Sequence, residues 1–447
     1  MGRSRKKLSD QPFEIEVESL DAKGLGLAEH EGKTLKVYDA LPGERVRARY
    51  LFGRGFRGKA ETLDVLRPTG DRVEARCPHF GVCSACSLQH LSVAAQLDHK
   101  LAALLMQLRE IGKVEPGVVY PPLDGPAWNY RRKARLSVRD VRGKERVLVG
   151  FRERNGRFVA DMDQCHILRD EVAGLLPVLA DLLGGMEGKA EIPQIEVACG
   201  DGQCALIFRH LAEISTADQQ RLCEFSALHG VGLYLQPGGP ETVHLLAPDG
   251  FRLTYCIEDP ALRFEFEPLD FLQVNGGLNQ KMITRALELL EPQTSENVLD
   301  LFCGLGNFTL PLATRAASVT GVEGSEKMVE RARENAVLNS IENVVFHDAD
   351  LYLGVGKQSP WQAAKFDKVL LDPPRTGASE LLPWIAACGA GKVLYISCNP
   401  ETLARDAGVL VHTLGFRLSG AGIMNMFPHT PHSEAIALFE RVDGITQ

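Results

Sequence analysis

The amino-acid sequence predicts an α/β protein with a Rossmann-like domain at its C-terminal end, preceded by a small β-barrel and an α+β region. At 447 residues, the chain is long enough for two or three domains. From about residue 270, short apolar strands alternate with helical segments, which is typical of a parallel sheet covered on both faces. The first 70 residues instead alternate apolar and charged side chains between glycine and proline turns, which is typical of a small barrel.

These patterns divide the chain into four parts. Residues 1–9 form a basic tail, and residues 10–70 form a barrel of the oligonucleotide-binding type, beginning with the alternating segment Phe13–Glu18. Residues 76–265 form the α+β central region, and residues 270–447 form the Rossmann-like domain. The five strands predicted in this last domain are Val298–Leu301, Ser318–Val322, Val344–Phe346, Lys368–Leu371 and Val393–Ile396.

Composition limits the compartment and the partners of the chain. No apolar run approaches the roughly 18 residues that a membrane span needs. The eleven cysteines, with no secretory signal before them, indicate a reducing cytoplasm, where metal binding or catalysis is expected rather than disulfides. The net charge is −8, yet residues 128–169 carry twelve Lys or Arg against five Asp or Glu, a local charge of +7. This asymmetry predicts a defined face for a polyanion, with a solvated basic surface as the alternative.

A glycine-rich turn follows the first strand of the Rossmann-like domain. The segment Asp300–Phe308 has the spacing Asp-x3-Gly-x-Gly and lacks the full dinucleotide fingerprint, which favours a cofactor without a pyrophosphate, such as S-adenosylmethionine. Glu323 ends the next strand and is placed to accept hydrogen bonds from ribose hydroxyls. Asp348 and Asp350 follow the third strand and would reach an adenine amino group. A plain structural turn is the alternative.

A cysteine lies at the end of the fifth strand. Cys398 precedes the turn-forming pair Asn399-Pro400, so its thiol is placed to meet a ligand and to act as a nucleophile in group transfer. Asp372 ends the fourth strand and is followed by two prolines that stiffen the backbone. Cys303 is the competing nucleophile, but it lies inside the cofactor turn and is expected to be a packed thiol.

Four further cysteines suggest a metal centre. Three of them have the spacing C-x5-C-x2-C, and 78 residues separate the fourth from the third. Four thiolates would hold zinc or an iron–sulfur cluster, and the lone fourth residue favours iron–sulfur; unpaired buried thiols are the remaining alternative. These residues are Cys77, Cys83, Cys86 and Cys165.

The basic segment contains a cluster suited to nucleic acid. Trp128 is followed closely by Tyr130–Arg135, which interleaves cations with an aromatic side chain. Such a stretch would contact an RNA backbone and stack on unpaired bases. The alternative is a β surface held together by ion pairs.

Five ordered motifs resemble those of the RNA uracil-C5 methyltransferase family, and most closely its branch that acts on 23S ribosomal RNA. They extend over the C-terminal domain, while the barrel and the cysteines extend the resemblance to nearly the whole chain. The motifs are Phe271–Asn275, Asp300–Gly304, Leu371–Arg375, Ser397–Pro400 and Pro428–Glu434.

The resemblance implies an S-adenosylmethionine-dependent methylation of a uridine in 23S ribosomal RNA. In that reaction Cys398 would be the nucleophile, which forms a bond to C6 of the ring, and Glu434 would be the general base. It also implies a TRAM-type barrel, a monomer, and a [4Fe-4S] cluster on the four cysteines. The cofactor pocket would be lined by Gln273, Phe302, Asn307, Glu323, Asp350 and Asp372.

Two alternatives stay open. The first is the same reaction on transfer RNA or on another ribosomal uridine. The second is a non-catalytic RNA-binding or ribosome-assembly factor with a vestigial cofactor pocket.

Overall fold

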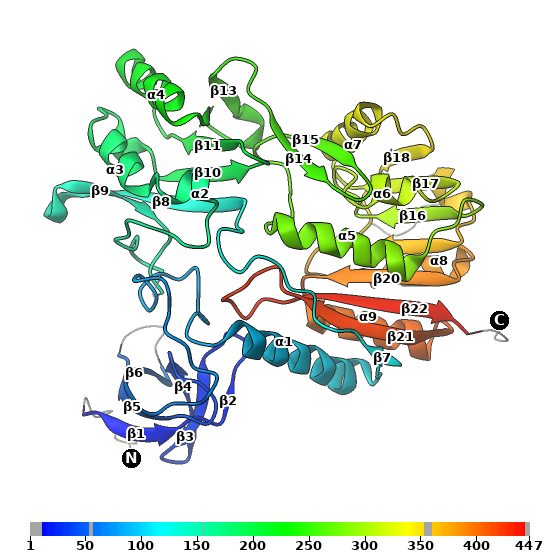
Figure 1. Cartoon of the computed structure of the whole chain (residues 1–447), viewed down its shortest axis with the longest axis horizontal. Coiled ribbons are helices and arrows are strands. Elements are labelled where there is room, and N and C mark those ends of the chain that lie inside the picture. Colours follow the sequence, from blue (N-terminus) through cyan, green and yellow to red (C-terminus); the bar gives the residue numbers. More distant parts are fainter. Residues whose placement is uncertain (1–10, 53–56, 155, 353–359, 443–447) are drawn as a thin grey trace, which may run out of the picture.

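The computed structural model describes residues 11–52, 57–154, 156–352 and 360–442, so the predicted basic tail of residues 1–9 lies outside the described residues. Figure 1 shows the N-terminal sheet at the lower left, the central sheet above it and the C-terminal sheet at the right. Among the described helices, none is both long and apolar enough to cross a membrane.

The predicted barrel is a curled six-stranded sheet in the order β1-β5-β6-β4-β3-β2. Its apolar side chains alternate with charged ones and enclose a small core that includes Val37, Val46 and Ala60. The alternation therefore buries one face of each strand, as expected. The strands are β1 (Phe13–Glu16), β2 (Ser19–Leu20), β3 (Gly26–His30), β4 (Lys33–Tyr38), β5 (Arg45–Tyr50) and β6 (Lys59–Arg67).

The central region contains a second six-stranded sheet, in the order β13-β12-β11-β10-β8-β9, followed by the hairpin β14-β15. Its strands are β8 (Lys133–Val141), β9 (Arg146–Gly150), β10 (Gln194–Cys199), β11 (Cys204–Arg209), β12 (Gly232–Gln236), β13 (His244–Ala247), β14 (Leu253–Ile257) and β15 (Leu262–Phe266). Its helices are α2 (Asp170–Ala173), α3 (Leu176–Gly184) and α4 (Thr216–His229).

One pair of cysteines differs from the expectation of reduced thiols. Cys199 and Cys204 lie directly opposite each other on β10 and β11 and form a disulfide. The expectation is therefore wrong for this pair, because the antiparallel register brings the two Cα atoms to 4.1 Å.

The third sheet has eight strands in the order β18-β17-β16-β19-β20-β22-β21-β7. The five strands predicted from continuous apolar runs are all present and parallel, and β22 is inserted antiparallel beside β20. The strands are β16 (Asn297–Leu301), β17 (Ser318–Glu323), β18 (Val344–Asp348), β19 (Lys368–Leu371), β20 (Lys392–Ser397), β21 (Phe416–Met424) and β22 (Glu434–Arg441). The helices are α5 (Gly276–Leu290), α6 (Thr309–Ala313), α7 (Glu326–Leu338), α8 (Leu382–Ala387) and α9 (Pro400–His412).

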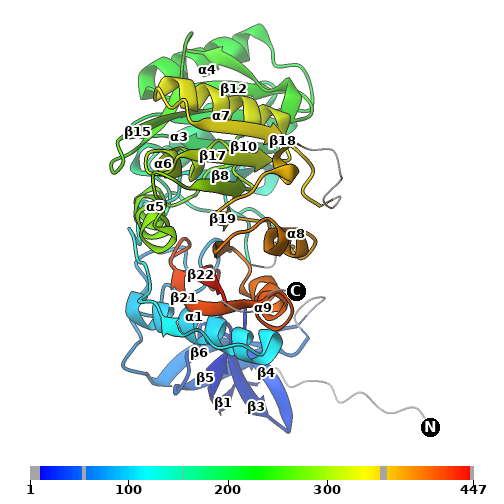
Figure 2. The same cartoon turned by 90° about the vertical axis from the view of Figure 1, so that its right-hand side faces the viewer.

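Two elements from the predicted central region pack against this third sheet. Helix α1 (Val93–Gln107) lies beside α9 and β21 (Figure 2), and Leu104 joins the same core as Val393 and Phe439. Strand β7 (Val118–Val119) pairs parallel with β21 and forms the edge of the sheet. The C-terminal sheet is therefore completed by residues from the first third of the chain.

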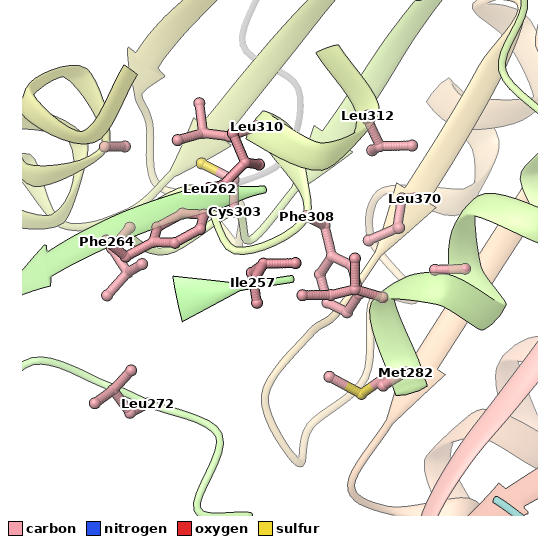
Figure 3. Close-up of a cluster of buried hydrophobic side chains, with 14 of the residues drawn as sticks. Ile257, Leu262, Phe264, Leu272, Met282, Cys303, Phe308, Leu310, Leu312 and Leu370 are labelled. Atoms are coloured by element: carbon pink, nitrogen blue, oxygen red, sulfur yellow. The ribbon is translucent and has the colours of Figure 1, made fainter. Parts of the chain in front are cut away.

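The hairpin β14-β15 joins the central region to the C-terminal domain through a shared core. Figure 3 shows Phe264 of the hairpin close to Cys303 and Leu310, with Met282 of α5 lining the same cluster. Close packing of this kind fixes the cofactor turn, which carries Cys303, against a rigid neighbour.

Candidate active site

Strand register brings the predicted nucleophile and the predicted base together. Strands β20 and β22 are antiparallel, with Ser397 opposite Ala435. Continuing this register by one residue places Cys398 opposite Glu434. Residues directly opposite each other in an antiparallel pair have Cβ atoms about 4.5–5.5 Å apart, so a thiol and a carboxyl group meet at the end of the sheet.

Burial disfavours the charged form of both groups. The pKa of the Cys398 thiol is raised to about 11, first by burial and then by the negative charges of Glu434 and Asp372. Burial, followed by the charge of Asp372, holds the pKa of Glu434 well above its ordinary value. The Arg375 guanidinium opposes both shifts, since a cation stabilises a thiolate and a carboxylate. A reaction here must therefore move protons off groups that normally hold them.

The turn after Cys398 is fixed by the neighbouring strand end. Asn399 donates a hydrogen bond from Nδ2 to the Arg375 carbonyl at 2.9 Å and caps helix α9. Thr402 Oγ1 donates to the same carbonyl at 3.3 Å. The two loops that carry the thiol and the arginine thus hold each other in place.

Asp372 influences the Cys398 thiol and also contacts a residue of the predicted cofactor pocket. It follows β19, and burial raises its pKa to about 7. Gln273 Nε2 donates a hydrogen bond to its Oδ2 at 3.3 Å, so these two predicted pocket residues are in contact.

The glycine-rich turn is held by hydrogen bonds to the end of β17. Phe302 has a φ of +64°, and the backbone N–H groups of Phe302 and Cys303 both donate to the Val322 carbonyl. Glu323 accepts hydrogen bonds from the N–H groups of Gly304 at 3.2 Å and Ser325 at 3.0 Å. The carboxylate predicted to bind ribose is therefore held against the turn.

Asp300, buried beneath this turn, has one unused oxygen. Thr309 Oγ1 donates to its Oδ2 at 2.5 Å, whereas Oδ1 has no hydrogen-bond partner among the described residues. Burial raises the pKa of Asp300 to about 8. A buried polar atom without a hydrogen-bond partner destabilises the folded state. A ligand group that donated a hydrogen bond to Asp300 Oδ1 would therefore bind favourably.

Asn307 and Asp350 are placed differently from the rest of the predicted pocket. Asn307 exchanges two amide hydrogen bonds with Asn279, and its Oδ1 also accepts one from the Tyr255 hydroxyl. Its side chain therefore ties α5 and β14 to the turn. Asp350 is exposed beyond β18, where its Oδ1 accepts a hydrogen bond from the backbone N–H of Tyr352.

Lys100 is a buried polar residue near the site that the sequence did not indicate. Its Nζ donates to Asn425 Oδ1 at 2.7 Å and to the Phe427 carbonyl at 3.0 Å, in the loop that leads to Glu434. Burial lowers its pKa to about 7. The signal in the sequence was its spacing, because Gln96, Lys100 and Leu104 recur every four residues on the buried face of α1.

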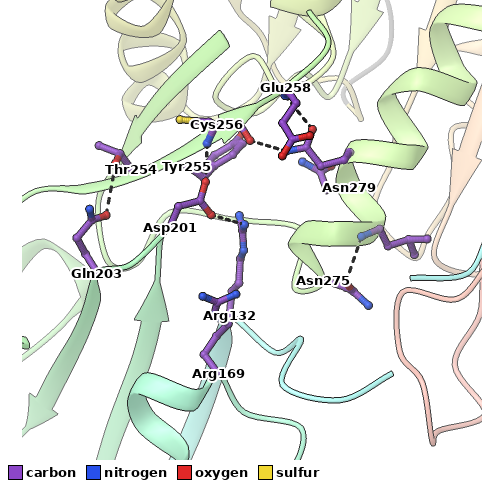
Figure 4. Close-up of polar contacts among 12 residues, drawn as sticks. Arg132, Arg169, Asp201, Gln203, Thr254, Tyr255, Cys256, Glu258, Asn275 and Asn279 are labelled. Carbon is purple, nitrogen blue, oxygen red and sulfur yellow. Dashed lines mark hydrogen bonds and ion pairs between the residues drawn. The ribbon is translucent and has the colours of Figure 1, made fainter. Parts of the chain in front are cut away.

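The basic stretch predicted to bind RNA is divided between interior and surface, with Tyr130 and Arg132 buried and Arg135 exposed. Arg132 is 7% exposed, pairs with Asp201 at 2.6 Å and lies 5.6 Å from the Tyr255 ring (Figure 4). Tyr130 is buried, and its hydroxyl donates to the Pro428 carbonyl. Tyr130 therefore joins the central region to the C-terminal domain, while the ion pair of Arg132 lies within the central region.

The four cysteines predicted to bind a metal line one small cavity of about 20 Å³. Burial raises the pKa of Cys83 to about 11 and that of Cys86 to about 12, and it also raises the pKa values of Cys77 and Cys165. Within the described ranges, no group of three or more His, Cys, Asp or Glu side chains has the arrangement of a metal site. The structure therefore gathers the four thiols without placing them in a metal-ligand geometry.

Comparisons with known proteins cover almost the whole chain. Residues 94–350 and 357–442 match the family described as tRNA (Uracil-5-)-methyltransferase. The 23S rRNA (uracil(1939)-C(5))-methyltransferase RlmD of Alkalilimnicola ehrlichii is 50% identical over 442 residues, which are 99% of each chain. The RlmD of Hahella chejuensis is 49% identical, over 99% of this chain and 100% of its own.

The fold has a solved counterpart. The crystal structure of Pyrococcus abyssi tRNA (uracil-54, C5)-methyltransferase, in complex with S-adenosyl-L-homocysteine, matches 96% of this chain and 100% of its own with a TM-score of 0.72 and 22% identity. This likeness concerns the fold alone. The extent of the family match and the identity to full-length relatives show that the chain belongs to the tRNA (uracil-5-)-methyltransferase family.

Proposed function

We propose that the protein transfers a methyl group from S-adenosylmethionine to C5 of uridine 1939 in 23S ribosomal RNA. Two relatives with this activity in their names are about half identical to the chain along its full length. The observation that carries the proposal is the register of β20 and β22, which supports a thiol opposite a carboxyl group when continued one residue beyond Ser397 and Ala435. The effect of the Glu434 charge on the pKa of Cys398 also supports it.

The thiol supplies the activation that uracil needs. C5 of uracil is a poor nucleophile until a group adds at C6. The Cys398 thiol gives its proton to water, since it is only partly buried, and its sulfur forms a bond to C6. The electron pair of the C5–C6 double bond moves toward O4, which leaves the ring as an enolate. S-adenosylmethionine, when bound, supplies a methyl group on a positively charged sulfur.

Glu434 completes the reaction. Once C5 carries the new methyl group, its hydrogen must leave as a proton, and the carboxylate opposite Cys398 is placed to accept it. The electron pair then restores the double bond and expels the sulfur from C6. Glu434 accepts this proton only as a carboxylate; burial raises its pKa and disfavours that form, and the nearby Arg375 guanidinium favours it.

The cofactor is proposed to bind at the glycine-rich turn. The unused Oδ1 of Asp300 and the two N–H bonds that hold Glu323 support this placement. The residues proposed to hold the cofactor are Gln273, Phe302, Asn307, Glu323, Asp350 and Asp372, of which Asn307 has the least free hydrogen-bonding capacity.

The four cysteines are proposed to hold a [4Fe-4S] cluster of structural function. What supports this is that all four line one cavity and that their thiols are costly to bury as thiolates unless a metal compensates. The cavity is small, so the cysteine loops would have to open. Anaerobically purified protein is expected to contain about four iron atoms and about four acid-labile sulfides per chain; one zinc per chain would contradict the cluster.

A side-by-side assay tests the substrate. Purified protein is given deproteinised 23S RNA, 16S RNA and bulk transfer RNA with methyl-labelled S-adenosylmethionine, and the modified nucleotide is located by RNA mass spectrometry. Methylation of 23S RNA at one uridine supports the proposal. Preferred methylation of transfer RNA would contradict it, and no methylation of any RNA would favour a binding factor. With this substrate the protein would act in the cytoplasm, and we propose that it acts as a monomer.

A further inference from the structure

A groove of about 570 Å³ lies between the N-terminal curled sheet and the cysteine-bearing segment, outside the site described above. Its volume is within the range of roughly 300–1,000 Å³ that small-molecule sites have. The residues that line it come from the end of β4, from the linker after β6 and from the cysteine-bearing segment. They are Asp39, Arg72, Val73, Glu74, Ala75, Phe80, Gly81 and His90.

Ion pairs hold the walls of the groove in place. Arg72 donates to the fully buried carboxylate of Glu44 through Nε at 2.6 Å and Nη2 at 2.8 Å. Arg154 makes a two-bond pair with Asp39 at 2.7 and 2.8 Å, and its guanidinium lies 5.1 Å from the Phe80 ring. Bidentate pairs fix geometry as well as charge, so the groove is preformed.

His90 is the unexplained group in this groove. It is 3% exposed, and neither ring nitrogen has a hydrogen-bond partner among the described residues. Burial lowers its pKa to about 4, so the ring is neutral and offers one donor and one acceptor. The centre of its ring lies 5.2 Å from that of Phe80. A buried polar ring beside an aromatic one suits a flat, polar ligand.

A series of ring contacts runs from the groove to the loop that precedes Glu434. Ala75 lines the groove, and the guanidinium of the next residue, Arg76, lies 5.1 Å from the Trp128 ring. Trp128 stacks on His429 with ring centres 3.9 Å apart. His429 belongs to the loop that ends at Glu434, and its carbonyl accepts hydrogen bonds from the N–H groups of Ser87 and Leu88.

We propose that this groove binds one unpaired nucleobase of the RNA substrate, with His90 hydrogen-bonded to the base edge and Phe80 against its ring. The inference rests on the proposed function, because an RNA whose target uridine lies at Cys398 would leave the site along Arg76 and Trp128. A base is a flat ligand with adjacent donors and acceptors, and recognition of unpaired bases by stacking and edge contacts is the usual mode for RNA. The groove would therefore help to select the RNA without taking part in methyl transfer.

The first test separates RNA selection from chemistry. His90→Leu is expected to raise KM for a 23S RNA fragment about tenfold, the value of one stacked and hydrogen-bonded base, with kcat unchanged. His210→Leu is the matched control, since His210 is also buried with an unpartnered Nε2 but lies in the central sheet region. Val73→Glu, at a side chain 42% exposed on the groove wall, tests the same site without a buried substitution and is expected to raise KM similarly.

The second test pairs protein and RNA changes. Each unpaired nucleotide near the target uridine is made abasic in turn, and KM is measured with the wild-type protein and His90→Leu. One abasic position is expected to raise KM about tenfold for the wild type. For His90→Leu, whose KM is already raised, the same position should cause no further increase in KM. The groove would not be a base site if every abasic position raised KM as much for His90→Leu as for the wild type. It would also not be one if His90→Leu and Val73→Glu left KM unchanged while the wild type methylated 23S RNA normally. Failure of the wild type to methylate any RNA would instead refute the proposed function.

Discussion

Cys303 and Cys398 occupy comparable places in the same sheet, yet their surroundings differ. Each lies just beyond the end of a parallel strand, β16 and β20 respectively, and burial raises the pKa of each thiol. Cys303 is 4% exposed and points into the apolar cluster of Figure 3. Cys398 is only partly buried and faces Glu434 across the sheet.

A cysteine at the end of a strand is therefore not a nucleophile because of its position alone. Both thiols are neutral at rest, so neither gains reactivity from its own pKa. Cys398 instead has access from solvent, a carboxyl group opposite it and an arginine that favours the thiolate. The following experiments test whether these neighbours decide the role.

The largest effect is expected from removing the two thiols one at a time. Cys398→Ala should abolish methylation of the RNA, a loss of about 10⁴-fold or more, because no other group can add at C6. Cys303→Ala, the matched control, should keep activity within about tenfold, with a stability loss of roughly 1 kcal/mol. Initial rates with labelled cofactor measure both. Methylation activity in Cys398→Ala would rule out the covalent mechanism.

The next effect concerns the carboxyl group opposite Cys398. Glu434→Gln should lower turnover by about 10²–10⁴-fold, because the C5 proton can no longer be removed. The methylated RNA should stay bonded to Cys398 and appear as a slow band in a denaturing gel. The band should be absent in the double variant with Cys398→Ala, and rapid product release by Glu434→Gln would point to another base.

A chemical comparison of the two thiols should show a smaller effect. Only the thiolate reacts with iodoacetamide, and the pKa of Cys398 is about 11. Its alkylation should therefore speed up about tenfold per pH unit, or about 100-fold from pH 7 to pH 9, where the thiolate fraction is still rising. Cys303 should stay unmodified over that range. Mass spectrometry of the two peptides follows both rates, and a rate for Cys398 that levels off below pH 8 would contradict the raised pKa.

The smallest effect is expected from the lysine that holds the loop before Glu434. Lys100→Met leaves Asn425 Oδ1 without its donor and removes one of two donors to the Phe427 carbonyl, which keeps the hydrogen bond from Thr430 Oγ1. The free energy of unfolding should fall by about 1–3 kcal/mol, and kcat should fall about tenfold as Glu434 loses its fixed position. Lys281→Met, which removes a single exposed bond to the Asp124 carbonyl, is the control. A loss of stability with kcat unchanged would make Lys100 a purely structural residue.

Much of the fold could be predicted, because its signals are local. The parallel strands were recognisable as apolar runs between helices, and all five are present. The antiparallel position of β22 was not predictable, since Glu434–Arg441 is another mainly apolar run with no mark of its direction. Yet that direction sets Glu434 opposite Cys398. The role of Glu434 therefore came from family resemblance, and the sheet supplies its geometry.

Buried cations are the features that the sequence pattern shows least well. Arginines and lysines are usually solvated, so the stretch Tyr130–Arg135 suggested a surface, whereas Arg132 is buried against Asp201 and Tyr255. Lys100 was overlooked for the same reason. A buried cation depends on partners that are distant in sequence, and spacing along the chain does not show them.

Because α1 and β7 pack against the C-terminal sheet, they limit where the chain can be truncated. Residues 270–447 alone would leave β21 as an open strand and expose the apolar side of α9 that α1 now covers. Such a fragment would pair with other chains instead of remaining monodisperse. A minimal catalytic unit must therefore begin upstream of residue 93, and during translation the N-terminal helix must wait for some 300 residues before its binding surface exists.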